Sequence, residues 1–171
     1  KLWKFAAESR KLTHIDENGT SWDKTFVPWQ FKDDANEGER GSSSPNFGFW
    51  EGYSQYEVTW RFDKTTNTYQ RENGVKPHVD RNNDKQIVAK NVIVVFMTER
   101  ALGDEEKHLL YRTKGRGKLL LFLDGKVIEG TWEKKDRVSR MQFFDGKGTP
   151  VKLNRGQIWI EVMPTGNDVT Y

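Results

Sequence analysis

Cysteine is absent from the 171 residues of this chain. Its absence excludes disulfide bonds, thiolate nucleophiles and the cysteine-rich class of zinc sites. A chain without disulfides fits the outside of a Gram-positive cell as well as a cytoplasm, so the absence does not by itself indicate a compartment.

Long apolar runs and an excess of one charge are also missing. No stretch approaches the roughly 20 apolar residues that a membrane-spanning helix needs. The formal net charge is only +3, far from the strongly basic balance of a dedicated nucleic-acid-binding protein. The chain begins at Lys1 rather than Met, so we expect an N-terminal piece of the parent protein to precede it.

Aromatic residues are abundant. They make up 13% of the chain and include seven Trp, against a hydrophobic fraction of 35% and a charged fraction of 31%. Large aromatic side chains supply the apolar area that this polar composition otherwise lacks, so the composition predicts a globular chain rather than a disordered one.

Strand patterns dominate the chain after residue 46. Residues 55–62 alternate polar and apolar side chains, which predicts a half-buried strand, and the apolar run 92–97 predicts a strand buried on both faces. Asp124-Gly125 is the strongest hairpin signal in the chain. We expect the following residues on apolar strand faces to be buried: Trp60, Val92, Val94, Phe96, Leu121, Trp132, Ile158 and Ile160.

A helical pattern occurs near the N-terminus, where Leu2, Phe5 and Ala6 share one face of a helix over residues 2–10. We therefore predict an α+β fold, a mostly antiparallel strand meander with hairpins and at least one N-terminal helix packed on the sheet. Residues 35–45 are acidic and then rich in Gly and Ser, which predicts a mobile loop or linker. It would separate a remnant of a preceding domain, residues 1–34, from a strand-rich domain, residues 46–171.

A succession of short motifs follows the strand pattern. These motifs are Trp60-Arg-Phe-Asp63, Tyr69-Gln-Arg71, Gly74, Pro77-His78, Asp80, Asn91-Val-Ile-Val94, Gly115-Arg-Gly117, Asp124-Gly-Lys126, Gly130-Thr-Trp132, Gly156-Gln-Ile-Trp159 and Pro164. In this order and spacing, over about residues 46–164, the chain resembles the C-terminal domain of the YerB-like family of bacterial lipoproteins. Residues 1–34 resemble the tail of that family's N-terminal domain. The resemblance implies an extracytoplasmic parent protein anchored to the membrane by lipid, and it implies no established activity and no catalytic residues.

Four polar residues form the first candidate site. Tyr69 and Arg71 share one face of an extended strand, and His78 and Asp80 are related in the same way. A turn around Gly74 would bring the two pairs together as a ligand-binding site, with His78 near a carboxylate that raises its pKa. The alternative is an ordered turn in which His78 and Asp80 bond neighbouring backbone and Arg71 pairs with a carboxylate.

Metal and cofactor signals are incomplete. The segment Asp80-Arg-Asn-Asn-Asp84 matches the opening of a calcium loop, but Lys85 and Asn91 stand where that loop requires Gly and Glu. A looser cation site and a polar turn remain alternatives. The three histidines, His14, His78 and His108, lack the spacing of a zinc site. We expect no metal ion and no cofactor.

The second candidate is a basic stretch. Residues 107–118 contain five Lys or Arg residues and no acidic one. Arg112, Lys114, Arg116 and Lys118 are candidate contacts for an anionic polymer or lipid headgroups. The alternative is a solvated strand edge whose lysines deter sheet-to-sheet pairing. Trp50 and Tyr53, after the Gly/Ser-rich stretch, are candidates for an exposed aromatic platform, although we expect them to be buried.

Three functions follow from these signals. The first is a non-enzymatic binding or scaffold module on the outer face of the membrane, whose partner is an anionic envelope polymer or another protein. The second is a hydrolase acting on cell-envelope polymers through a site near His78 and Asp80. The third is a weak polyanion or nucleic-acid contact through residues 107–118.

Overall fold

The structure, a computed structural model, describes residues 26–171 together with Glu8, Ile15, Gly19 and Ser21. Between residues 26 and 171 it contains sixteen strands and two short 3-10 helices, and no α-helix covers a sheet there. The protein is therefore mainly β, and the predicted α+β class is wrong. The expected helix over residues 2–10 lies outside the described residues, apart from Glu8. In the described part, no helix is long and apolar enough to cross a bilayer.

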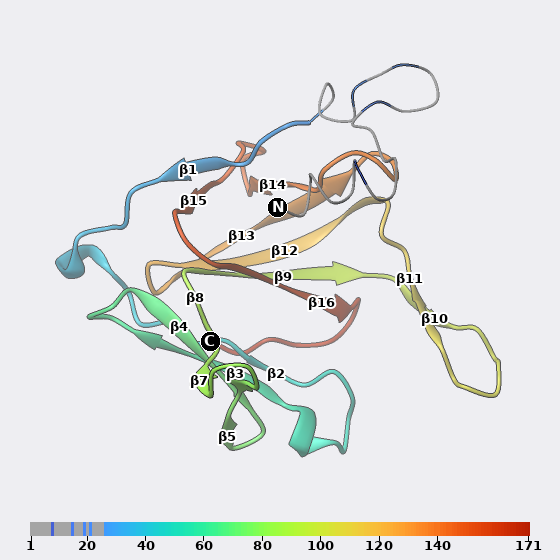
Figure 1. The fold of residues 1–171 in the computed structure, drawn as a ribbon, viewed down its shortest axis with the longest axis horizontal. Coiled ribbons are helices and arrows are strands. Elements are labelled where there is room, and N and C mark those ends of the chain that lie inside the picture. Colours follow the sequence, from blue (N-terminus) through green and yellow to red (C-terminus); the bar gives the residue numbers. More distant parts are fainter. Residues whose placement is uncertain (1–7, 9–14, 16–18, 20, 22–25) are drawn as a thin grey trace.

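The first sheet has five strands in the order β14-β13-β12-β9-β16 (Figure 1). Their bounds are Asn91–Met97 for β9, Gly115–Leu123 for β12, Lys126–Lys134 for β13, Gln142–Asp145 for β14 and Ile158–Pro164 for β16. The pairs are antiparallel except that β16 runs parallel to β9. Every residue of β9 is buried, which confirms the strand predicted to be covered on both faces.

The β12–β13 hairpin turns at Asp124-Gly125, as its sequence predicts. Leu123 pairs with Lys126 across the turn, and both turn residues have positive φ, 53° for Asp124 and 65° for Gly125. Asp and Gly tolerate this left-handed backbone better than other residues. A side chain at Gly125 would also collide with Gly41 and Phe62, which pack against the turn.

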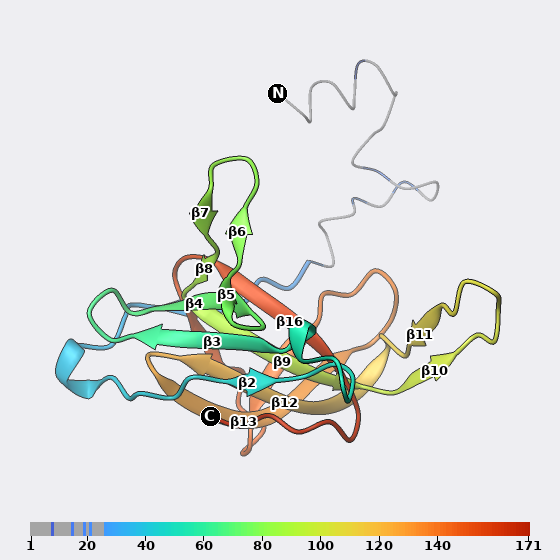
Figure 2. The same cartoon turned by 90° about the horizontal axis from the view of Figure 1, so that it is seen from below.

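The second sheet covers one face of the first. It contains β2 (Asn46–Phe47), β3 (Val58–Asp63), β4 (Thr68–Asn73), β5 (Lys76–Pro77) and β8 (Val88–Ala89), with β8 also pairing with β4. The two sheets form two layers, seen edge-on in Figure 2. Trp60 and Tyr69 of the second sheet pack in one core cluster with Val92, Val94 and Phe122 of the first. A second sheet, rather than a helix, thus buries this apolar face.

The opposite face of the first sheet carries a second core cluster that includes Ile93, Leu121, Trp132 and Leu153. Beside it, β1 (Gln30–Lys32) pairs in parallel with β15 (Lys152–Asn154). Because β1 is paired there, residues 30–32 are part of the same sandwich as residues 46–171. The proposed division of the chain at residue 34 stays a prediction.

Two hairpins leave the sandwich in different directions (Figure 2). One consists of β6 (Val79–Asp80) and β7 (Lys85–Gln86), and the other of β10 (Glu99–Ala101) and β11 (Leu109–Tyr111). The two 3-10 helices are η1 (Glu37–Glu39) and η2 (Ser54–Tyr56), and η2 directly precedes β3.

Six of the eight predicted core residues are buried, from Trp60 at 0% exposure to Phe96 at 6%. Ile158 is half-buried, and Ile160 is 38% exposed, so its predicted burial is wrong. The reason is that β16 is an edge strand whose inward face carries Glu161 and Met163 instead. Both faces of this strand are partly apolar, so alternation does not determine which one turns inward.

Asp124 fastens several chain segments to the β12–β13 turn. Its side chain accepts hydrogen bonds from Lys32, from Asn67 (2.8 Å) and from Asn154 (2.7 Å). The segment 35–45 passes beside it, where the Gly41 amide donates to the Asp124 carbonyl (2.9 Å). This bond and the bond from the Ser43 amide to the Gly125 carbonyl (2.8 Å) hold part of a segment expected to be mobile against the turn. Its mobility stays a prediction that limited proteolysis measures.

Candidate functional site

The four residues of the first candidate site do not share one environment. Tyr69 and Arg71 lie on the inward face of β4 and are 0% and 6% exposed. The Tyr69 hydroxyl accepts a hydrogen bond from the Gly125 amide (3.0 Å), and burial raises the pKa of this hydroxyl above its ordinary value. Tyr69 therefore joins the second sheet to the β12–β13 turn.

Arg71 lies between the two sheets. Its Nε donates to Glu161 Oε1 (3.1 Å), and the same carboxylate oxygen accepts a bond from Trp60 Nε1 (3.1 Å). The guanidinium carbon lies 5.2 Å from the centre of the Trp159 ring, within range of a cation–π interaction. The fork of Arg71 is thus directed at the protein interior, as in the alternative of a structural carboxylate pair.

His78 contacts Arg71 and not Asp80. Its Nδ1 lies 2.6 Å from Arg71 Nη1. Burial lowers the pKa of His78, and the positive charge of Arg71 lowers it further, whereas Glu161 raises it less. The expected rise of the pKa is therefore wrong, because burial and then a neighbouring cation both disfavour the charged imidazole. Asp80 Oδ1 accepts bonds from the backbone (2.9 Å) and side chain (2.8 Å) of Asn82, inside the β6–β7 hairpin.

The structure thus unites Tyr69 and Arg71 on one strand face, joins His78 to Arg71, and leaves Asp80 in the separate β6–β7 hairpin. Ligand binding by these four residues stays a prediction. The partly calcium-like segment 80–84 forms the turn of this hairpin, with Asp84 at a positive φ of 55°.

The four cations of the second candidate site line one cleft. This basic cleft, defined by Arg112, Lys114, Arg116 and Lys118, has a volume of about 470 Å³. It lies where β12 begins, and the end of β9, Trp132 and Thr165 complete its wall. None of the described residues that line it is acidic.

Fixed contacts shape the floor of the basic cleft. Trp132 Nε1 donates to the Phe96 carbonyl (2.9 Å), and a side chain at Gly117 would collide with both groups. The Lys118 ammonium lies 5.4 Å from the centre of the Phe96 ring. Glycine at residue 117 therefore leaves room for the bond between Trp132 and Phe96. The Phe96 ring in the floor of the cleft positions the Lys118 ammonium.

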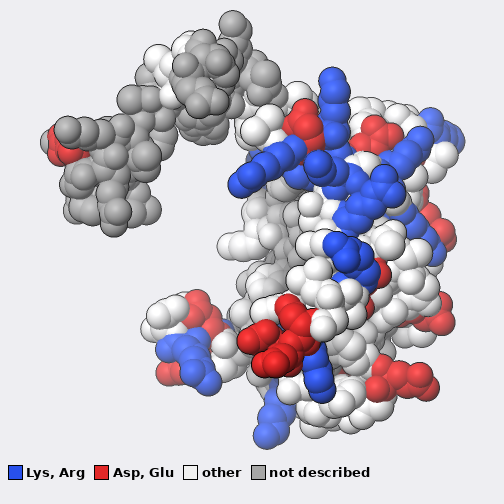
Figure 3. Space-filling view, turned by 90° about the vertical axis from the view of Figure 1, so that its right-hand side faces the viewer, with Lys and Arg blue, Asp and Glu red and all other residues white. Residues whose placement is uncertain are grey.

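Most of the cleft's positive charge is uncompensated. Arg116 lies 3.6 Å from Glu133 in an exposed pair, whereas Arg112, Lys114 and Lys118 have no ion-pair partner among the described residues. Figure 3 views the side of the molecule on the right of Figure 1 and shows Lys and Arg gathered over part of it. A second open pocket adjoins the cleft through Gly115 and Arg116 and adds Lys134, Lys135 and Arg140 to this positive surface.

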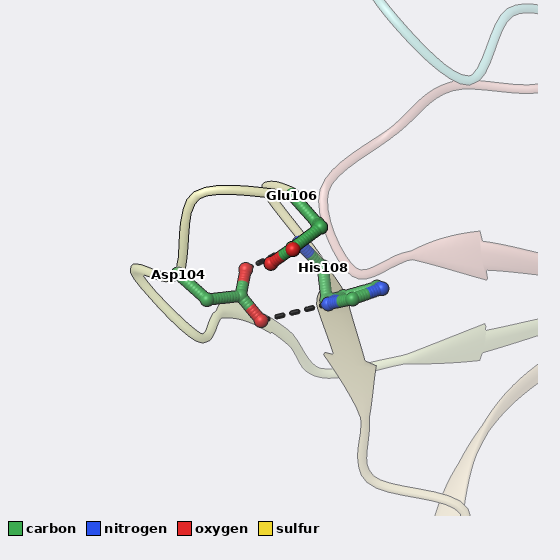
Figure 4. A group of neighbouring side chains, drawn as sticks. All are labelled: Asp104, Glu106 and His108. Carbon is green, nitrogen blue, oxygen red and sulfur yellow. Dashed lines mark hydrogen bonds and ion pairs between the residues drawn. The ribbon is translucent and has the colours of Figure 1, made fainter.

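A third group of polar residues lies at the tip of the β10–β11 hairpin. Ligand atoms of Asp104, Glu106 and His108 lie within 4.8 Å of one another, and all three side chains are exposed (Figure 4). Asp104 accepts bonds from the His108 amide (2.9 Å) and ring (2.7 Å), and the bonds from His108 lower the pKa of Asp104. The arrangement offers three ligands of the kind that divalent cations use, but its internal bonds also suffice to order the turn.

The spacing of the histidines does not predict this group, because it contains no pair of histidines. Here one histidine stands two and four residues after acidic residues in a hairpin loop. Of the other histidines, His14 lies outside the described residues.

A match to a known family covers most of the chain. Residues 49–160 match the profile of a family described as "Protein of unknown function (DUF3048) C-terminal domain". The chain belongs to the DUF3048 family. The resemblance to YerB-like proteins stated from the motifs is thereby confirmed.

A solved crystal structure has a similar fold. The crystal structure of the YerB protein from Bacillus subtilis is similar to this chain with a TM-score of 0.73 and 21% sequence identity. The similarity covers 99% of this chain and 53% of the YerB chain, so this chain spans about half the length of YerB. At this identity the likeness shows the fold alone. No curated protein matches the sequence.

The part that matches DUF3048 contains Arg71, His78 and the four cations of the basic cleft. Glu161, the buried partner of Arg71, follows directly after it. The local pattern does not predict the burial of Glu161, because the neighbouring Ile158 and Ile160 suggest the opposite face as the inward one. The signal that identifies it is an acidic residue between Trp159 and Met163, on the face that turns inward.

Proposed function

We propose that this domain is a non-enzymatic binding module on the outer face of the membrane, part of a lipid-anchored parent protein, and that its basic cleft holds phosphate groups of an anionic envelope polymer. Membership of the DUF3048 family and the resemblance to YerB-like lipoproteins support the location. The observation that carries the binding role is a single cleft whose described lining contains four cations and no acidic residue.

The chemistry of the cleft favours phosphate. Arginine offers a planar fork that matches phosphate oxygens, and lysine adds a mobile point charge. Because Arg112, Lys114 and Lys118 have no ion-pair partner among the described residues, a ligand does not have to displace an existing carboxylate. The hydroxyls of Thr98 and Thr165 on the cleft wall add uncharged hydrogen-bonding groups.

The other two functions stay predictions. His78 and Asp80 bond different partners, so nothing observed in the described residues pairs a base with an acid at the site expected for a hydrolase. A nucleic-acid contact shares the chemistry of the basic cleft, but the net charge of +3 is small for that role.

Binding of inorganic polyphosphate by the purified domain, measured calorimetrically at several salt concentrations, tests the proposal. The variant Arg112→Gln/Lys114→Gln removes two unpaired cations of the cleft, and Lys64→Gln/Lys76→Gln removes two exposed lysines elsewhere as the matched control. A plot of log affinity against log salt concentration has a negative slope, and we expect this slope to be shallower by roughly two in the cleft variant than in the wild type.

The control should bind polyphosphate nearly as the wild type does. Equal losses in both variants, or no binding by the wild type, would contradict the role of the cleft. Duplex DNA and vesicles containing phosphatidylglycerol are the comparison ligands. Tighter binding to DNA than to polyphosphate would favour the nucleic-acid contact, and tighter binding to vesicles would identify a lipid headgroup as the source of phosphate.

A further inference from the structure

Three aromatic side chains lie exposed in the segment between β2 and β3, and none of them lines the basic cleft. Trp50, Tyr53 and Tyr56 are 50%, 55% and 52% exposed, and among the described residues these three line an open pocket of about 590 Å³. The expected burial of Trp50 and Tyr53 is therefore wrong. A tight turn at Gly52 and the three-residue helix η2 carry these rings.

The sandwich holds this aromatic platform in place. Ring contacts lead from the buried Phe47 to Phe49 (5.7 Å), from Phe49 to Trp50 (6.0 Å) and from Trp50 to Tyr56 (5.8 Å). Asn167 donates to the carbonyls of Gly48 (3.0 Å) and Phe49 (3.2 Å), which fixes the loop before Trp50. The rings are therefore preorganised, and a ligand would not have to pay for ordering them.

The platform has the shape of a corner. The Tyr53 and Tyr56 rings are inclined by only 30°, so they form a shelf, and the Trp50 ring stands at 84° to Tyr56. The face of an aromatic ring is negative, and the C–H groups on the face of a sugar ring are slightly positive. A pyranose ring can therefore lie on the shelf with its edge against Trp50.

A polar groove adjoins the platform. Its volume is about 520 Å³, and it is lined by Ser54, Gln55 and Glu57 around η2 and by residues of the outer face of the second sheet. The side chains of these three residues have no hydrogen-bond partner among the described residues. The groove thus offers free donors and free acceptors next to three exposed rings, and sugar hydroxyls need both.

We propose that the Trp50–Tyr53–Tyr56 platform and its polar groove bind a neutral oligosaccharide of pyranose sugars. Single-stranded nucleic acid also stacks on aromatic rings, but it needs a positive groove, whereas the cation here, Arg61, is already paired with Glu72 (2.7 Å). A proline-rich peptide presents mainly carbonyl acceptors, which would leave the Glu57 carboxylate without a donor. The proposal does not depend on the basic cleft.

Titration with three soluble hexasaccharides, cellohexaose, chitohexaose and maltohexaose, tests the proposal by two-dimensional NMR of the tryptophan indole N–H groups. The signal missing from Trp50→Ala identifies Trp50, and at least one hexasaccharide should shift it saturably at concentrations up to about 10 mM. Trp50→Ala and Tyr56→Ala should each weaken that binding about tenfold, as expected for the loss of one aromatic stacking contact.

Tyr171→Ala, which removes another half-exposed aromatic ring, is the matched control and should bind as the wild type does. Because all these rings are exposed, the variants should melt at nearly the wild-type temperature. The proposal is overturned if no hexasaccharide shifts the Trp50 signal, if binding survives Trp50→Ala unchanged, or if a decaproline peptide binds the platform and the sugars do not. Trp50→Ala should bind polyphosphate as strongly as the wild type does. This measurement distinguishes a failure of sugar binding at the platform from a failure of phosphate binding at the basic cleft.

Discussion

Arg71 and Arg112 carry the same guanidinium group in opposite settings. Arg71 is buried between two sheets, with Glu161, Asn73 and His78 around its fork. Arg112 lines an open cleft and has no ion-pair partner among the described residues. The first arrangement satisfies the charge inside the protein, and the second leaves it available to a ligand. The burial of the charge and its partners, rather than the residue type, therefore separate a structural arginine from a candidate binding one.

The largest effect should come from the carboxylate that compensates Arg71. Glu161→Ala leaves a buried guanidinium without its counter-ion, which should lower the free energy of unfolding by about 3–5 kcal/mol. Urea denaturation followed by tryptophan fluorescence measures it. The matched control is Glu72→Ala, whose partner Arg61 is exposed, and we expect its unfolding midpoint to stay close to that of the wild type.

A double variant sharpens this comparison. Replacing both members of the buried pair, in Arg71→Met/Glu161→Leu, removes the uncompensated charge, so stability should recover most of the loss seen in Glu161→Ala. If Glu161→Ala is as stable as Glu72→Ala, the Arg71–Glu161 pair does not hold the sheets together, and Arg71 regains its place as a candidate ligand contact.

The next effect concerns Asp124, the other buried charge. Burial raises its pKa, but hydrogen bonds from Lys32, Asn67 and Asn154 outweigh burial, and the net pKa lies below the ordinary value. Because the folded pKa is depressed, its stabilisation is complete above the unfolded pKa of about 3.9 and is lost as the pH falls through the folded value.

Asp124→Asn isolates this charge, since Asn tolerates the positive φ of residue 124. We expect a loss of about 1–3 kcal/mol at neutral pH, where a charged acceptor is replaced by a neutral amide. Below about pH 4 the stabilities of the two proteins should begin to converge. A stability difference that is the same at pH 3 and pH 7 would show that the charge is not the cause.

These predictions rest on features that the sequence reveals to different degrees. The run 92–97 and the turn at Asp124-Gly125 predict β9 and the β12–β13 hairpin, because a continuous apolar run and an Asp-Gly turn have few other structures available to them. The basic cleft is also visible in the sequence, since alternate residues of one strand carry Arg116 and Lys118 on one face.

Other features depend on distant segments. The inward direction of Glu161 depends on Arg71, 90 residues earlier, and no local pattern encodes that distance. His78 is another case, since its spacing to Asp80 predicted a carboxylate neighbour, and the structure supplies Arg71 instead. The exposure of Trp50 and Tyr53 likewise depends on whether other segments of the chain pack over them. A local pattern of apolar residues does not encode that packing.

A smaller effect should come from His78. Its pKa is lowered in the folded state, so the folded protein binds fewer protons than the unfolded chain between the folded value and the unfolded value of about 6.5. Stability should therefore fall as the pH decreases through that window, and His78→Asn should remove this part of the pH dependence. Melting temperatures measured from pH 7 to pH 5 test it. If the wild-type protein instead gains stability relative to His78→Asn as the pH falls from 7 to 5, the predicted direction of the pH effect is wrong.

The smallest effect on stability should come from Arg112→Gln. Its side chain lines the open basic cleft and pairs with no carboxylate among the described residues, so the free energy of unfolding should change by less than about 0.5 kcal/mol. Arg71→Gln makes the same chemical change at the buried position and should destabilise the protein strongly, because Glu161 loses its charged partner there. Urea denaturation of both variants under one set of conditions measures the difference directly. If Arg112→Gln destabilises the protein as much as Arg71→Gln does, the cleft is a structural part of the sandwich and not a free surface for phosphate.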